Sequence, residues 1–165
     1  MKTLLTIGLA CVAIGAHAQL SEAIKLTDKE QFEKATVAFK QAIAANPKSG
    51  EAWFYMGENY FANDQSDSAA IAYQKGIEVA PTFPLNYAGT GKILRQKGDM
   101  SGAQAQFTKA SEVAETKANK FSKAQIAATY REEAEGLLAG KAPDYTAAMA
   151  LIQKSIDLYP KDPEV

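Results

Sequence analysis

Histidine and cysteine, the side chains most often used for catalysis and metal binding, occur once each in the 165 residues, as His17 and Cys11. Imidazole and thiolate groups activate nucleophiles and hold most protein-bound zinc ions. Both residues lie close to the start of the chain, in a segment that we expect to be removed from the mature protein. The acidic segment 131–135 reads as exposed helix surface rather than as a catalytic carboxylate pair. We therefore expect no catalytic residue, no cofactor site and no metal site, and hence no enzyme.

The start of the chain has the pattern of an export signal. Lys2 precedes an apolar run over residues 4–16, and Ala16 and Ala18 supply the small residues that precede a cleavage site. We predict cleavage after Ala18 and export to the periplasm or the cell envelope. The signal peptide would then be residues 1–18.

Two alternatives for this segment remain open. The first is a retained membrane anchor, although the 13 residues of the apolar run fall short of the roughly 20 that span a bilayer. The second is a lipoprotein acylated on Cys11, although the residues before it match such a leader poorly and the apolar run continues past it through Ile14. We favour cleavage, and we expect no transmembrane segment in the mature chain.

Cleavage would also change the composition. It removes Lys2, His17 and Cys11, which leaves 17 basic and 19 acidic residues and a net charge of −2. Proteins that bind nucleic acids normally carry a basic surface that neutralises phosphates. We therefore expect no nucleic-acid partner.

The strongest pattern in the chain is an internal repeat. Small, aromatic and aliphatic residues recur at fixed spacing from Trp53 to Pro81. These positions are Trp53, Met56, Gly57, Tyr60, Ala69, Tyr73, Gly76 and Pro81. The same residue types recur one period later at Tyr87, Gly91, Leu94, Ala103, Phe107 and Ala110, and one period earlier at Ala23, Leu26, Ala35, Phe39, Ala42 and Pro47. Three matches in one register are much more specific than one match to a loose pattern.

This pattern resembles the tetratricopeptide repeat, a helix-turn-helix unit of about 34 residues. The resemblance implies an all-α fold, an α-solenoid of stacked helix pairs with about four repeats in a domain over residues 19–165. We expect the repeats at about residues 19–49, 50–83, 84–117 and 118–162. The last repeat carries 11 extra residues, because Ala148 stands where a strict period from Ala103 predicts position 137. We expect these residues mainly to lengthen the first helix of that repeat, by about two turns.

Residue size along the repeat predicts how the helices pack. Gly57 and Gly91 are small enough to let neighbouring helices approach closely. Tyr73 and Phe107 are large enough to fill the space between helices. These residues are therefore expected to be structural rather than ligand-binding.

The resemblance also implies a concave groove lined by the first helix of each repeat. The candidate partner-binding residues are Glu51, Phe54, Glu58 and Phe61 in the second repeat and Leu85, Lys92 and Arg95 in the third. Such a groove would change sign along its length and suit a peptide that carries charged and aliphatic residues. The alternative is that Phe54 and Phe61 pack on the adjacent helix while the charged residues only solvate the surface.

One function found in cytosolic members of this family is not implied. Those members hold the C-terminal carboxylates of chaperones with a clamp of lysine, arginine and asparagine side chains. None of the matching positions here carries such a group. They are Leu20, Ile24, Tyr55, Leu85 and Gly89.

Taken together, these features predict a non-catalytic, exported scaffold that binds a protein or peptide partner through its groove. One alternative is a structural accessory subunit of an envelope assembly or transport complex. Another is the N-terminal module of a longer protein. Residues 160–165 look like the opening of a further repeat. We therefore also expect self-association through an uncapped C-terminal repeat.

Overall fold

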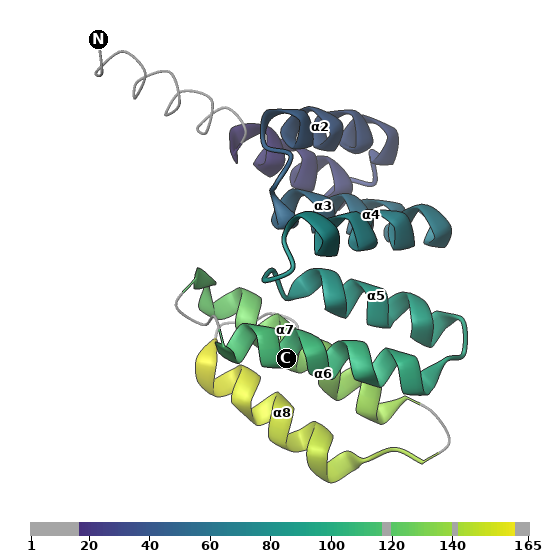
Figure 1. Cartoon of the computed structure of the whole chain (residues 1–165), viewed down its shortest axis with the longest axis vertical. Coiled ribbons are helices and arrows are strands. Elements are labelled where there is room, and N and C mark those ends of the chain that lie inside the picture. Colours follow the sequence, from purple (N-terminus) through teal and green to yellow (C-terminus); the bar gives the residue numbers. More distant parts are fainter. Residues whose placement is uncertain (1–16, 117–119, 140–141, 161–165) are drawn as a thin grey trace. The chain divides into compact units, whose positions relative to one another are not determined.

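A computed structural model of the chain describes residues 17–116, 120–139 and 142–160 (Figure 1). Within these ranges the secondary structure is helical and contains no strand, which confirms the predicted all-α fold. Residues 1–16 of the predicted export signal lie outside the described residues. The predicted cleavage site at Ala18 falls in a helix over residues 17–28. No described helix combines the length and the apolar character needed to cross a membrane.

The chain divides into two compact units, Met1–Ala80 and Pro81–Val165. The single domain expected over residues 19–165 stays a prediction. In unit 1, the helix over residues 17–28 is followed by three others. These are α2 (Phe32–Ala45), α3 (Gly50–Ala62) and α4 (Ser66–Val79). Helix α3 contacts both α2 and α4, so consecutive helices stack as the repeat pattern predicts.

Unit 2 contains α5 (Leu85–Gln96), α6 (Met100–Thr116), α7 (Lys123–Leu138) and α8 (Tyr145–Leu158). Each helix contacts the next, and α5 also contacts α7. Helix α7 begins with a capping box, because the Ser122 side chain accepts from the Gln125 backbone N–H while the Gln125 side chain accepts from the Ser122 N–H. This reciprocal pair satisfies two backbone donors at a helix start and fixes where α7 begins.

The 11 extra residues between Ala103 and Ala148 are spread over several elements, which corrects the expectation of a first helix lengthened by two turns. Helix α7 has 16 residues and α5 has 12, a difference of about one turn. Helix α6, with 17 residues, also exceeds the 14 of α4. Helix α7 stops at Leu138 because Ala139 takes an extended backbone (φ −79°, ψ 146°), and α8 begins only at Tyr145.

Close approach of an aromatic ring to a glycine holds neighbouring helices together in both units. In unit 1 a Cβ added to Gly57 of α3 would meet the ring of Tyr73 in α4. In unit 2 the fully buried ring of Phe107 lies between two glycines. A Cβ on Gly91 of α5 would lie 2.6 Å from that ring, and one on Gly136 of α7 would lie 2.5 Å from it. The predicted packing roles of Gly57, Gly91 and the two aromatic residues are confirmed.

A buried polar contact in unit 1 joins three helices. The Asn59 side chain of α3 is fully buried. Its Oδ1 accepts from Thr27 Oγ1 at 2.9 Å, and its Nδ2 donates to Phe32 O at 3.2 Å and to Thr36 Oγ1 at 2.9 Å. These partners lie on the helix over residues 17–28 and on α2. A buried amide that lost them would cost about 1–3 kcal/mol, so this contact fixes the three helices in one register.

The glycine contacts lead to a stability prediction for Gly91→Ala. Alanine in a helix interior normally stabilises by about 1 kcal/mol relative to glycine. Here the methyl group would collide with the enclosed Phe107 ring, and overpacking costs about 1–3 kcal/mol. We expect net destabilisation of up to about 2 kcal/mol in urea unfolding followed by circular dichroism. In a Phe107→Leu background, Gly91→Ala should lower the free energy of unfolding by less than it does in the wild type. Stabilisation by Gly91→Ala alone would contradict the packing argument.

Candidate partner-binding surfaces

The predicted binding residues lie on two helices that belong to different units. Glu51, Phe54, Glu58 and Phe61 lie on α3 of unit 1, and Leu85, Lys92 and Arg95 lie on α5 of unit 2. Each set is brought together by its own helix. Leu85 is 4% exposed, so it offers little surface to a partner.

The two predicted phenylalanines of α3 are half-buried. The Phe54 ring lies 5.2 Å from the Tyr55 ring in an edge-on arrangement and 6.0 Å from the Tyr73 ring of α4. Glu58 accepts a 2.5 Å hydrogen bond from the Tyr73 hydroxyl. Phe54 therefore packs on the adjacent helix and also keeps part of its ring at the surface.

Three carboxylates lie close enough to Tyr55 of α3 to act on its phenol. Burial raises the pKa of the Tyr55 phenol, and the negative charges of Glu51, Glu58 and Asp28 raise it further. Burial alone would raise the pKa, and the smaller part of the rise that comes from these charges reflects negative potential at the phenol. Asp28, Glu51, Phe54, Tyr55 and Glu58 together form what we call the acidic aromatic surface. Sequence reasoning missed Asp28, because it comes from the helix before α2, and it considered Tyr55 only as a clamp position.

The two predicted cations of α5 are paired with carboxylates of α7. Lys92 lies 3.7 Å from Glu132, with only 15% and 17% of the two side chains exposed. Arg95 lies 3.3 Å from Glu135, and its guanidinium lies 5.6 Å from the centre of the Phe107 ring. The residues of each helix are three apart, so the pairs form two neighbouring rungs.

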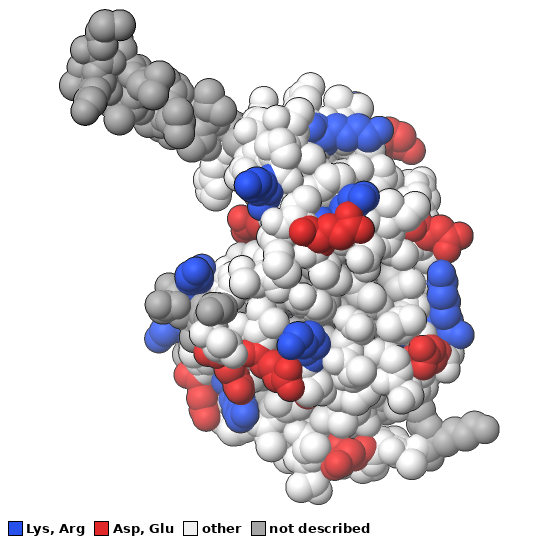
Figure 2. All heavy atoms as spheres, viewed as in Figure 1, with Lys and Arg blue, Asp and Glu red and all other residues white. Residues whose placement is uncertain are grey.

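These rungs correct the expectation that segment 131–135 is exposed helix surface, since Glu132 is largely buried. The carboxylates of α7 also place negative charge beside the two α5 cations, which were expected to make one half of the groove basic. On the face that Figure 2 shows, acidic and basic side chains of unit 2 are interspersed rather than gathered by sign. A partner carboxylate would have to compete with Glu132 and Glu135.

A second charged cluster joins α6, α7 and α8. The Tyr130 hydroxyl donates to Glu115 at 3.0 Å, and Lys154 lies 3.5 Å from the same carboxylate. The Lys154 ammonium also lies 5.2 Å from the centre of the Tyr130 ring. Burial, followed by the bond to Glu115, raises the pKa of Tyr130 to about 12. The phenol therefore stays neutral and acts as a donor that holds the helices together.

Metal-binding groups do not gather in the part of the chain that the structure describes. No group of three or more His, Cys, Asp or Glu side chains there is arranged to hold a metal ion. The carboxylates described above face tyrosines and cations instead.

Comparison with known proteins bears on the family. Residues 26–93 match the family model described as tetratricopeptide repeat. The match supports this family for the chain. The matching segment runs from the helix before α2 to α5.

Curated relatives match over part of their length. The general transcriptional corepressor trfA of Dictyostelium discoideum is 29% identical over 98 residues, which cover 58% of this chain and 7% of that protein. The small glutamine-rich tetratricopeptide repeat-containing protein 2 of Mycosarcoma maydis is 32% identical over 81 residues, which cover 49% of this chain and 23% of that protein. The chain spans less than a quarter of the length of these relatives.

Solved structures share the fold. The type III secretion chaperone SycD of Yersinia enterocolitica, in complex with a peptide of the translocator YopD, has a TM-score of 0.59 at 19% identity. The match covers 74% of this chain and 92% of that one. The Sgt2 tetratricopeptide-repeat domain of Aspergillus fumigatus has a TM-score of 0.57 at 22% identity and covers 79% and 87%. The fold is an all-α stack of tetratricopeptide-type helix pairs, as predicted.

The raised pKa of Tyr130 predicts how stability depends on pH. A phenol whose pKa rises from 10 to about 12 on folding stabilises the fold below pH 10 and loses that contribution as the pH rises toward 12. We expect the free energy of unfolding of the wild type to fall more steeply over this range than that of Tyr130→Phe. Urea titrations at the two ends of the range measure both slopes, with Tyr145→Phe as the control for removing an exposed hydroxyl. Equal slopes for wild type and Tyr130→Phe would contradict the assignment.

Proposed function

We propose that the chain is a non-catalytic scaffold that binds a polypeptide through the acidic aromatic surface of unit 1. Two findings support a protein-binding role. The fold is that of tetratricopeptide-repeat proteins, and a similar structure, SycD, was solved with a peptide bound. The observation that carries the proposal is the set of three carboxylates whose charges act on Tyr55, next to the partly exposed Phe54 of the same helix.

This surface favours a segment that is both basic and apolar. Lysine or arginine side chains would be attracted by Asp28, Glu51 and Glu58, and aliphatic groups would cover the exposed parts of Phe54 and Tyr55. Exposed charges act mainly on association and are screened by salt. The aromatic contact would therefore supply the part of the affinity that persists at high ionic strength.

The two predicted cations on α5 of unit 2 are poorly placed to attract an acidic segment. They already have carboxylate neighbours on α7, at 3.7 Å for Lys92 and 3.3 Å for Arg95. A partner that displaced these pairs would leave carboxylates without their cations, which is costly where the groups are largely buried. The proposed specificity is therefore for positive charge, at unit 1.

The peptide-binding proposal is tested by fluorescence anisotropy with two labelled peptides of equal length, one rich in lysine and leucine and one rich in glutamate and leucine. We expect the wild type to bind the lysine peptide more tightly. Glu51→Gln with Glu58→Gln should weaken this binding about tenfold or more, because two attractive charges are removed. Both substitutions keep the size of the side chain, and the amide oxygen that Glu58→Gln introduces can still accept from Tyr73.

The matched control is Glu33→Gln with Glu112→Gln, which removes two exposed charges from other helices. It should leave the affinity for the lysine peptide within about twofold of wild type. An equal loss of affinity for the lysine peptide in both double variants would show that net charge, and not this surface, determines the binding. Preference for the glutamate peptide would overturn the proposal.

We further propose that the chain is exported and cleaved after Ala18. The support is the order of a basic residue, an apolar run and small residues at positions 16 and 18. Expressed in a Gram-negative host, the protein should appear in the periplasmic fraction with Gln19 as its first residue by intact-mass spectrometry. Ala18→Arg should block processing, because cleavage requires a small residue there. A full-length mass confined to the cytosol would contradict export.

A further inference from the structure

Helix α8 packs on unit 2 through one face. Ala148 and Ser155 are fully buried, and the Ser155 hydroxyl donates to the Ala127 carbonyl of α7 at 3.2 Å. Leu151 and Leu158 lie on the same face and pack against the buried cluster that contains Ile126 and Tyr130. This face accounts for how α8 is held.

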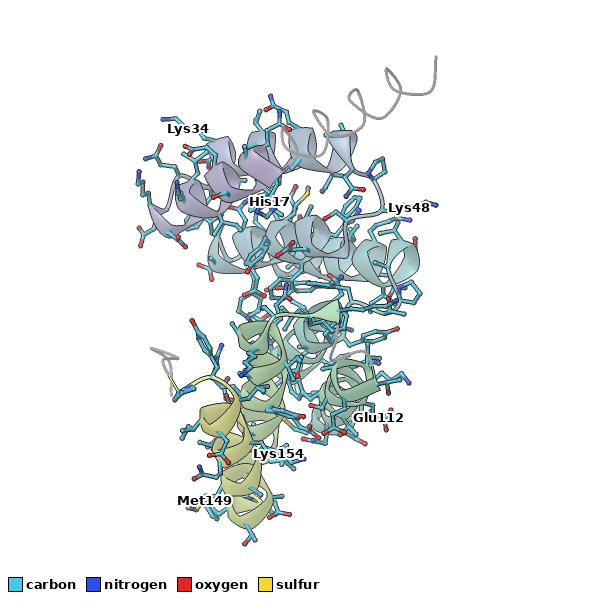
Figure 3. All side chains as sticks on the ribbon, turned by 90° about the vertical axis from the view of Figure 1, so that its left-hand side faces the viewer. His17, Lys34, Lys48, Glu112, Met149 and Lys154 are labelled. Carbon is cyan, nitrogen blue, oxygen red and sulfur yellow. The ribbon has the colours of Figure 1, made fainter. Side chains whose placement is uncertain are left out.

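A second apolar face of α8 points away from this core. Tyr145, Met149, Ile152 and Ile156 follow one another at spacings of four, three and four, which places them on one side of a helix. Tyr145 is 65% exposed and Met149 is 71% exposed, and the two isoleucines are half-buried. Figure 3 shows Met149 at the outer surface of α8. We call these four residues the α8 stripe.

The α8 stripe corresponds to a face that is covered in the preceding repeat. Helix α6 begins at Met100 and α8 at Tyr145, so Met149 and Ile152 correspond to Gln104 and Phe107. In α6 these two side chains contact the position of Gly136 on α7. The equivalent face of α6 is therefore the one on which the next helix stacks.

Unit 1 uses the same face independently. Gln104 is the α6 counterpart of Met149, and the residue two repeat periods before Gln104 is Thr36 of α2. Thr36 accepts a hydrogen bond from Asn59 of the following helix α3. In both α2 and α6, each the second helix of its repeat, this face is thus covered by the helix that follows. On α8 the same face is apolar and open, so it has the geometry of a stacking interface without a following helix in the described part of the chain.

We propose that the α8 stripe binds the α8 stripe of a second copy of this chain. The spacing of four, three and four is that of a heptad seam, which allows two identical helices to interlock side by side. The stripe carries no charge, and neither do Thr146 and Gln153 on its open flank. Farther round that flank, Asp157 accepts a hydrogen bond from Gln153 at 2.7 Å. Along the stripe itself a second copy meets only uncharged residues, and the contact is a two-fold one in which each helix supplies the same residues.

The expected dimer is weak. One helix face per copy falls short of the about 800 Å² per partner of a standard interface. Dimerisation should therefore depend on protein concentration in the micromolar range and above. It is independent of the acidic aromatic surface, so peptide binding by unit 1 should persist in monomeric variants.

Sedimentation velocity of the full chain over an about hundredfold range of concentration measures the association. We expect a shift from monomer to dimer in the wild type, and Met149→Glu should raise the dissociation constant more than about tenfold by placing two charges at the contact. Ile71→Glu is the matched control, because Ile71 of α4 is 64% exposed and lies on no such stripe. It should dimerise like the wild type. A monomer at every concentration, or a dimer undisturbed by Met149→Glu, would overturn the proposal.

Disulfide cross-linking locates the contact. In a Cys11→Ser background the chain has no cysteine, so Met149→Cys introduces a single thiol at the stripe. Mild oxidation should give a covalent dimer from Met149→Cys and much less from Ile71→Cys. Equal cross-linking of the two variants would show that the association does not run through α8 and would also overturn the proposal.

Discussion

The contact of an aromatic ring with a glycine sets the helix spacing on which each unit depends. Phe107 is enclosed by Gly91 and Gly136, and a methyl group at either glycine would overlap its ring. Because the two glycines lie on α5 and α7, one side chain of α6 fixes the separation of the helices on either side of it. The distance at which Lys92 meets Glu132 and Arg95 meets Glu135 follows from that spacing. The charged rungs of unit 2 are therefore a consequence of packing beneath them.

The fold could be predicted because the residues that make this contact recur in the sequence at a fixed period. The pair Gly57 and Tyr73 recurs one period later as Gly91 and Phe107, and both pairs meet in the structure. The partner of Phe107 on α7 could not be predicted in this way. Gly136 falls within the extra residues of the last repeat, whose distribution depends on where α7 begins and ends. The capping box at Ser122 and the extended backbone at Ala139 decide this, and neither follows from the period.

The candidate surfaces could be predicted by position but not by environment. The helical period correctly groups Phe54 with Glu58 on α3, yet the contribution of Asp28 depends on how another helix lies beside them. Likewise, Lys92 and Glu132 belong to different repeats, and the extra residues change the register between their helices. Asn59 shows the same limit in the core, since its three hydrogen bonds come from two other helices. Local spacing predicts which side chains share a face, while burial and pairing depend on tertiary contacts.

Stacked repeats make one face of each second helix a surface for another helix, and the residues there reflect what covers it. On α2 and α6 this face includes polar groups, Thr36 and Gln104, that lie against the next helix of the chain. On α8 the corresponding residue is Met149, with 71% of its surface exposed. A helix face that only met water would gain nothing from four apolar residues in a heptad pattern, because exposed apolar surface favours association. The composition of the stripe therefore matches a face that is covered, and its lack of charge makes an identical helix a compatible cover.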